Sequence, residues 1–222
     1  MSPQAHTKSF LRPAKIIKAG LKFNVWIKLL SLTLVYLENI IFVPNEQSIF
    51  IKALRNPLTK EEAFKKLVSE YKERLYWHIR KLVLDHDDAH DVVQNTFIKI
   101  HLNIDRFREN SSLYTWMYRI ATNESLNFIN SKASKMGLQN QEWIEAKANG
   151  LMADSYFDGD QAALRLQKMV AQLPEKQRIV FNMKYFDNMN YEAMSEILDT
   201  SVGALKASYH HAVKKIKNEL ND

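Results

Sequence analysis

The residue types in this chain favour binding over catalysis. Its 222 residues include no cysteine, which excludes disulfides, zinc–thiolate sites and cysteine nucleophiles. The sequence also shows no candidate catalytic constellation: no carboxylate pair in an acid–base motif, no nucleophile motif and no phosphate-binding loop. We therefore expect that the protein is not an enzyme and that it has no cofactor and no small-molecule substrate.

One pair of histidines has the spacing of metal ligands. His86 and His90 are four residues apart, so on a helix they share a face, as the histidines of the H-E-x-x-H zinc proteases do. Here Asp replaces the usual Glu, and no clear third ligand follows. The alternative is the start of a solvent-facing helix, where the carboxylates of Asp87, Asp88 and Asp91 suit the helix dipole. We expect no metal site.

The segment from Ser111 to Asn130 combines aromatic rings, amides and a cation. Aromatic faces stack on unpaired bases and amides read base edges, so this segment could bind single-stranded nucleic acid. The alternative is a core helix, and Trp116, which lies on the apolar stripe, is expected to pack in the fold. Four residues lie off that stripe and are expected on the surface: Tyr114, Arg119, Asn123 and Asn127.

The segment from Asn190 to Leu220 predicts two helices joined by a short turn, with Asn190 and Ser201 as their N-caps. The second helix has an apolar stripe and an opposite basic face, which consists of Gly203, Lys206, Ala207, His210, Lys214 and Lys217. Small residues and cations at the exposed start of a helix suit the major groove of DNA, where lysines hold phosphates. The alternative is a helical hairpin with a solvated lysine face.

Net charge by itself says little about nucleic-acid binding. The formal charge is +6, but residues 1–43 carry +5 of it and residues 44–222 only +1. The argument must therefore rest on where the charges lie. Residues 1–43 also contain the apolar run LLSLTLVYLENIIFV, which could belong to a secretory signal, a membrane span or an interfacial anchor. We favour another origin, a start codon assigned too early, with Val43 as a candidate later start.

Hydrophobic periodicity indicates an all-α chain of two small helical domains. Helices are expected over 62–84, from about 87 to 102, from 113 onward behind the caps Ser111 and Ser112, and after Leu173-Pro174. Residues 131–162 lose this periodicity and carry more acids than bases. The expected organisation is an extension over 1–43, a first domain over 58–133, a flexible acidic linker over 134–160 and a second domain over 161–222.

Two segments resemble the small extracytoplasmic-function sigma factors, group IV of the sigma-70 family. DAHDVVQNTFIKIHLNIDRFRENSSLYTWMYRIATNESLNFIN, from Asp88 to Asn130, is similar to their region 2, with its D-A-x-D-x-x-Q-x-T-F and T-W-x-Y-R-I-A helices. Leu173 to Leu220 is similar to their region 4, with L-P-x-x-Q-R, Y-E-x-x-x-x-I-L and S-V-G-x-x-K. With the helix at 62–84, the resemblance covers nearly all of residues 60–220.

The resemblance implies a cytoplasmic sigma factor with a helix-turn-helix in its second domain. Its partners would be core RNA polymerase, promoter DNA and an anti-sigma factor. The surface that binds polymerase would include Asp91, Gln94, Asn95 and Phe97. The residues that open the −10 element and capture a flipped base would be Tyr114, Arg119, Asn123 and Asn127. The helix that enters the −35 major groove would use Ser201, Val202, Gly203, Lys206, His210 and Lys214.

The chain departs from the family pattern in the last of these helices. Lys206-Ala207-Ser208 stands where K-S-R is frequent, and His210 and His211 stand near a frequent Arg. The resemblance therefore does not fix the base readout at −35. Two other functions stay open, a free-standing helix-turn-helix regulator with an N-terminal ligand or dimerisation domain and, more remotely, a metal hydrolase built on His86 and His90. The Ser111–Asn130 segment distinguishes a sigma factor from a free regulator, because a free regulator needs no segment that binds single-stranded DNA.

Overall fold

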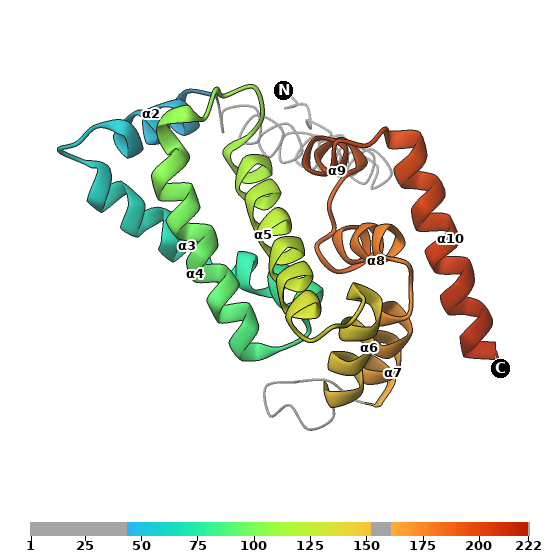
Figure 1. Cartoon of the computed structure of the whole chain (residues 1–222). Coiled ribbons are helices and arrows are strands. Elements are labelled where there is room, and N and C mark those ends of the chain that lie inside the picture. The colour runs from blue at the N-terminus through green and yellow to red at the C-terminus, as the bar shows by residue number, and fades with distance from the viewer. Residues whose placement is uncertain (1–43, 152–160, 222) are drawn as a thin grey trace, which may run out of the picture. The chain divides into compact units, whose positions relative to one another are not determined.

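The computed structural model describes residues 44–151 and 161–221, and each regular element within these ranges is a helix (Figure 1). The all-α class predicted from the sequence is thereby confirmed. The expectations for residues 1–43 lie outside the described residues, as does the part of the expected linker over 152–160. None of the described helices is long and apolar enough to cross a bilayer.

Three long helices form the first domain, and two of them begin at a side-chain cap. They are α3 (Lys60–Val83), α4 (His86–Asn103) and α5 (Leu113–Lys135), with the short 3-10 helix η1 (Ile104–Arg106) after α4. Ser112 caps α5, as expected, by accepting a hydrogen bond from the Thr115 N–H at 3.0 Å. Asp85 caps α4 in the same way, accepting from the Asp88 N–H at 3.0 Å.

The core of this domain lies where α3, α4 and α5 contact one another. Its fully buried side chains include Leu67, Leu75, Ile79, Ile100, Met117 and Ile129. Each such side chain stabilises the fold by about 1.5–3 kcal/mol through its removal from water. Because the buried positions recur at helical spacing in all three helices, the apolar pattern fixes which face of each helix turns inward.

The packed part of the chain begins earlier than residue 58, the expected start of the first domain. A helix that the sequence analysis did not predict, α2 (Pro44–Arg55), precedes α3, and its residues from Ile51 onward belong to the same contact unit as the rest of the described chain. Ile51 and Leu54 are fully buried. Arg55 forms an ion pair with Glu109 at 3.0 Å and donates a hydrogen bond to the Phe107 carbonyl.

The first part of the expected flexible linker is a docked helix, so that expectation is wrong for residues 134–151. Helix α5 runs on to Lys135, and α6 (Asn140–Gly150) follows it. Trp143 and Ile144 of α6 are buried. Lys147 forms ion pairs with Asp85 and Asp88 at the start of α4, both at 2.8 Å. Buried apolar area and paired charge hold α6 in place, which a count of acidic residues does not reveal.

The second domain is built from α7 (Gln161–Ala171), α8 (Glu175–Phe181), the π-helical turn η3 (Asn182–Phe186), α9 (Tyr191–Leu198) and α10 (Val202–Asn221). Its core joins residues of α7, α8 and α10 with Leu173, namely Met169, Val170, Leu173, Phe181, Ala212 and Ile216. Both predicted caps are confirmed. Asn190 accepts from the Ala193 N–H at 2.7 Å, and Ser201 from the Ala204 N–H at 3.3 Å.

The two domains touch directly. Helix α5 lies against α9, α3 against η3, and α6 against α7, and the last two helices run side by side in Figure 1. The residues from Ile51 onward form a single contact unit. The helices that carry the predicted single-strand segment and the predicted helix-turn-helix therefore belong to one packed body.

Candidate functional site

Helix α10 turns an apolar side to the core of the second domain and a basic side to solvent. Leu205, Ala212 and Ile216 are buried. The exposed side carries Gly203, Lys206, His210, Lys214 and Lys217, whereas Val202 is half-buried. Within the described part of the chain, no lysine of α10 takes part in an ion pair. The charge of this face is therefore available to a polyanion.

The start of α10 is open around Gly203. A Cβ added to this glycine would meet no atom within 4 Å, so packing in the fold does not require glycine there. A glycine inside a helix costs about 1 kcal/mol relative to alanine. Because glycine has no side chain, a partner's backbone can approach the helix closely beside Ser201 and Lys206.

The ring of Tyr191, at the start of α9, lies beneath two lysines. The Nζ atoms of Lys184 and Lys206 are 5.1 Å and 5.6 Å from the ring centroid. Attraction between the ammonium groups and the ring quadrupole holds both side chains over its face. Burial, and then the neighbouring Tyr209, raise the pKa of the Tyr191 hydroxyl above its ordinary value. The ring therefore stays neutral while it orients the two cations.

Of the four residues predicted to read the −10 element, three share one face of α5. Arg119, Asn123 and Asn127 follow one another at intervals of four and are exposed. Tyr114 lies apart from them, because five residues at about 100° each place it on another side of the helix. The structure therefore brings the cation and the two amides together and separates the aromatic residue from them.

Tyr114 is half-buried and packs on a neighbour. Its ring centroid is 4.2 Å from that of Tyr118, at an interplanar angle of 35°. Burial raises the pKa of both hydroxyls above the ordinary value of tyrosine. Trp116, expected to pack, lies half-buried with its ring centroid 5.1 Å from that of Phe107. The aromatic residues of this segment are thus engaged within the fold.

A groove runs along α4, on its side toward α3. It has a volume of about 530 Å³, and Phe64, Val68, Asp91, Gln94, Phe97 and Ile98 are among its lining residues. Three of the four residues predicted to bind polymerase, Asp91, Gln94 and Phe97, line this groove. Asn95 is exposed outside it. Phe97 is largely buried against the edge of Phe64, and Ile98 and Leu102 expose apolar surface beside it.

The histidine pair His86 and His90 lies together at the start of α4. Their ring centroids are 4.5 Å apart, and the Tyr76 hydroxyl is 2.8 Å from Nδ1 of His86. Among the described residues, no group of three or more metal-ligating side chains gathers in one place. In the fold these histidines belong to an aromatic cluster in which Tyr76 and His86 are hydrogen-bonded.

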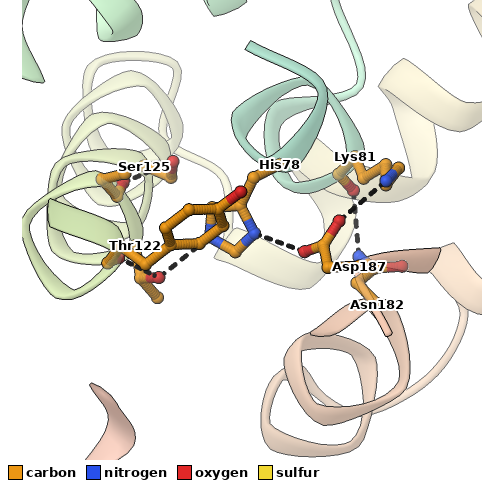
Figure 2. Close-up of polar contacts among 8 residues, drawn as sticks. His78, Lys81, Thr122, Ser125, Asn182 and Asp187 are labelled. Carbon is orange, nitrogen blue, oxygen red and sulfur yellow. Dashed lines mark hydrogen bonds and ion pairs between the residues drawn. The ribbon is translucent and has the colours of Figure 1, made fainter. Parts of the chain in front are cut away.

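A polar cluster that the sequence analysis did not find joins the two domains (Figure 2). Asp187, which follows η3, accepts from Nδ1 of His78 at 2.6 Å and from Nζ of Lys81 at 2.8 Å. Burial by itself would raise the pKa of the Asp187 carboxyl, but His78 and Lys81 hold it below its ordinary value. No local signal marks this cluster, because 109 residues separate His78 from Asp187.

Comparisons with known proteins agree with the arrangement of the two domains in the sequence. The family model described as Sigma-70 region 2 matches residues 67–135, and the model described as Sigma-70, region 4 matches residues 163–216. The first match covers α4 and α5 and most of α3. The second covers the helices from α7 to most of α10. The two domains of the structure thus each have a counterpart among known families.

Curated relatives share this organisation over most of their length. The chain is 28% identical over 170 residues to the ECF RNA polymerase sigma factor SigW of Bacillus subtilis, covering 73% of this chain and 91% of the relative. It is 27% identical over 168 residues to the ECF RNA polymerase sigma-E factor of Escherichia coli K12, covering 72% and 87%.

Solved structures with the same fold include CnrH in complex with the cytosolic domain of CnrY. The TM-score is 0.58 at 20% identity, over 79% of this chain and 97% of that one. Another is RpoE of Bartonella quintana with the anti-sigma factor NepR, at a TM-score of 0.56 and 21% identity, over 71% of this chain and 96% of that one.

Proposed function

We propose a role for each surface of this protein on one premise. The premise is that the chain belongs to the extracytoplasmic-function group of the sigma-70 family. The two family models match in order and together span more than half of the chain, and the curated relatives carry that name. The protein is an RNA polymerase sigma factor, which directs core polymerase to promoters and helps to open DNA at initiation. The chemistry of RNA synthesis then belongs to the polymerase, and the protein supplies binding.

The lysine face of α10 is the observation that carries the assignment of the −35 contact. Residues 44–222 are nearly charge-balanced, yet the lysines of this helix form no ion pair with any carboxylate that the structure describes. We propose that Ser201 and Gly203 approach base edges in the major groove at the start of α10. Lys206, His210 and Lys214, on the same face, would lie nearer the phosphates. Val202, which is half-buried, supports the position of the helix start.

The exposed side of α5 supports a role at the −10 element. Arg119 can bind the backbone of the opened strand, while the amides of Asn123 and Asn127 can hydrogen-bond to the edge of an unstacked base. We assign Tyr114 to the same task, although it lies on another side of α5. Its ring would have to leave Tyr118 to stack on a base. This step makes Tyr114 the least direct of the four assignments.

The groove on α4 is the proposed docking surface for core RNA polymerase. It combines apolar walls, formed by Phe97 and Ile98, with the polar groups of Asp91 and Gln94. A helix of the partner with an apolar stripe and flanking cations would fit such a surface. Asn95, exposed beside the groove, would contribute at its rim.

Further partners follow from the family. RpoE of Bartonella quintana, a solved structure with this fold, is bound to an anti-sigma factor. We propose that an anti-sigma factor also controls this protein, and that it acts in the cytoplasm, where promoter DNA and polymerase are found. The alternative of a free-standing helix-turn-helix regulator is not favoured, because the region 2 match covers the whole of α4 and α5.

Transcription in vitro tests this function. Purified full-length protein is added to bacterial core RNA polymerase and a library of promoter fragments, and transcripts are sequenced. We expect association with the core enzyme and initiation at a defined set of promoters that core alone does not use. If the protein binds DNA fragments specifically but never associates with core polymerase, it is a free regulator and the proposal is wrong.

A further inference from the structure

We propose that Asp187 is the centre of an interdomain latch that holds the helix-turn-helix domain on the first domain and keeps Arg119, at one end of the −10 surface of α5, engaged by α9. The latch consists of Asp187 and Asn182 on one side and His78 and Lys81 on the other. It rests on the proposed function, since it restrains a residue assigned to −10 DNA. In this closed state Asn123, Asn127 and the lysine face of α10 stay exposed, so the latch restrains Arg119 and leaves the other promoter contacts free.

The contacts of Asp187 are those of a buried charge with both oxygens occupied (Figure 2). Its side chain is only 7% exposed, and His78 opposite it is 1% exposed. Oδ2 lies 2.6 Å from Nδ1 of His78 and Oδ1 lies 2.8 Å from Nζ of Lys81. A charge buried to this degree is costly unless it is paired, so these two partners decide whether the domains can remain in contact.

His78 is hydrogen-bonded on both sides of its ring. Its Nε2 lies 3.0 Å from the Thr122 hydroxyl, which donates to the Tyr118 carbonyl at 2.7 Å. The Asp187 carboxylate accepts from Nδ1 on the other side. The imidazole thus links α5, through Thr122, to the turn after η3.

The turn that presents Asp187 is shaped for this contact. In the π-helical turn η3, the Asp187 N–H reaches back to the Asn182 carbonyl at 3.2 Å. The Asn182 side chain, fully buried, donates to the Lys81 carbonyl at 3.1 Å. Such π-helical turns often occur at functional sites. Lys81 is thus held at its backbone by Asn182 and at its ammonium group by Asp187.

The closed arrangement engages one end of the surface that must meet DNA. Helix α9 lies on α5, and the Arg119 guanidinium, which we assign to the opened strand, donates to the Glu196 carbonyl of α9. For Arg119 to bind the −10 strand, it has to leave this carbonyl. Movement of α9 away from α5 requires that the Asp187 contacts break.

The chemistry of this contact suits a reversible closure. Its direct links are polar, and every group in it can be hydrated when the domains separate, so little is lost on opening. Interfaces between domains of one chain resemble transient protein–protein interfaces and separate readily. Binding of the opened −10 strand by Arg119, which α9 engages in the closed state, would favour the open state, because that contact forms only after opening.

A distance measurement on the full chain tests the latch. Because the sequence has no cysteine, Glu73→Cys on α3 and Lys217→Cys on α10 can be labelled with a donor and an acceptor dye. In this background Asp187→Asn is compared with Asp199→Asn, which makes the same charge change at an exposed position of the same domain. Asp199 has a φ of 48°, a conformation that Asn tolerates as well as Asp.

We expect Asp187→Asn to lower the energy transfer and Asp199→Asn to leave it unchanged. The open population should rise about tenfold or more, because hydrogen bonds to charged groups shift equilibria by at least that factor. Lys81→Gln, which removes a second partner, should act in the same direction. Circular dichroism establishes that each variant is folded, and Lys81→Gln replaces Asp187→Asn if the latter is not.

Addition of core RNA polymerase separates failure of the latch from failure of the proposed function. With wild-type protein, energy transfer should fall when core and a promoter fragment are added together, and the promoter complex should open faster with Asp187→Asn than with Asp199→Asn. If folded Asp187→Asn and Lys81→Gln keep the wild-type energy transfer while core still binds, the latch is wrong and the function stands. If core binds no variant and changes no signal, the proposed function is wrong.

Discussion

Replacement of Lys206 by alanine should weaken duplex binding in a way that depends on salt. Lys206 lies on the exposed face of α10, close to Ser201, and no carboxylate among the described residues pairs with it. If its ammonium group binds one phosphate, the slope of log K against log salt should become shallower by about 0.9. Over a fourfold rise in salt, from about 50 to 200 mM, the variant should then lose about 3.5-fold less affinity than wild type.

Lys215→Ala is the matched control for this measurement. Lys215 is also exposed and also on α10, but nine residues at about 100° each place it on the opposite side of the helix from Lys206. The two variants lose the same charge from the same helix. Binding of the full chain to a duplex that contains the selected −35 element is followed by fluorescence anisotropy across a salt titration. We expect a shallower slope for Lys206→Ala and a wild-type slope for Lys215→Ala.

Two outcomes would refute this reasoning. Equal slopes for wild type and Lys206→Ala would mean that the lysine binds no phosphate. Equal changes of slope in Lys206→Ala and Lys215→Ala would mean that only the net charge of the domain matters and that neither side of α10 contacts DNA preferentially. If the slopes are equal but Lys206→Ala loses affinity at low salt, the first outcome also places the side chain at a base edge rather than a phosphate.

Three other changes should have effects that follow from the structure. Asn123→Ala should leave core binding intact and slow open-complex formation severalfold or more, since a base contact contributes about 1–3 kcal/mol; loss of core binding would show instead that Asn123 supports the fold. Trp143→Ala should reduce the free energy of unfolding by about 3–5 kcal/mol in urea denaturation, because the ring is buried where α6 docks, whereas an effect below about 1 kcal/mol would mean that α6 is only loosely held. The difference in free energy of unfolding between Asp85→Asn and wild type should become smaller as pH falls. Burial raises the pKa of Asp85, but the Asp88 N–H and Lys147 lower it more, below the ordinary 3.8. The ionised Asp85 carboxylate therefore contributes its full stabilisation above that value, and this stabilisation is lost as pH falls through the folded-state pKa. A difference in free energy of unfolding that stays constant from pH 7 to pH 3 would contradict this.

The local features of the fold could be predicted because their causes are local. Ser112, Asn190 and Ser201 cap helices through hydrogen bonds to backbone groups three residues later, so type and position are enough to find them. The apolar stripe of α10 is also local, and Leu205, Ala212 and Ile216 are buried on one side of the helix. The lysine face follows as its complement.

Helix α6 was missed because its stability comes from contacts with distant residues. Its acidic residues and the glycines around it suggested a flexible segment. One local sign was present, since the Glu142 carboxylate accepts from the Gln139 N–H at 2.8 Å, as in a capping box. The decisive contacts, from Lys147 to Asp85 and Asp88, bridge about sixty residues. The same holds for His78 and Asp187, whose types alone gave no reason to pair them.

The Tyr191 ring, which carries the ammonium groups of Lys184 and Lys206, has a consequence for the thermodynamics of recognition. A lysine fixed by a phosphate gives up rotamer entropy equivalent to as much as about 2 kcal/mol. Here part of that entropy is already lost when the domain folds, because the ring restricts where each side chain points. The duplex then meets cations that are preorganised, and affinity is gained without any additional contact.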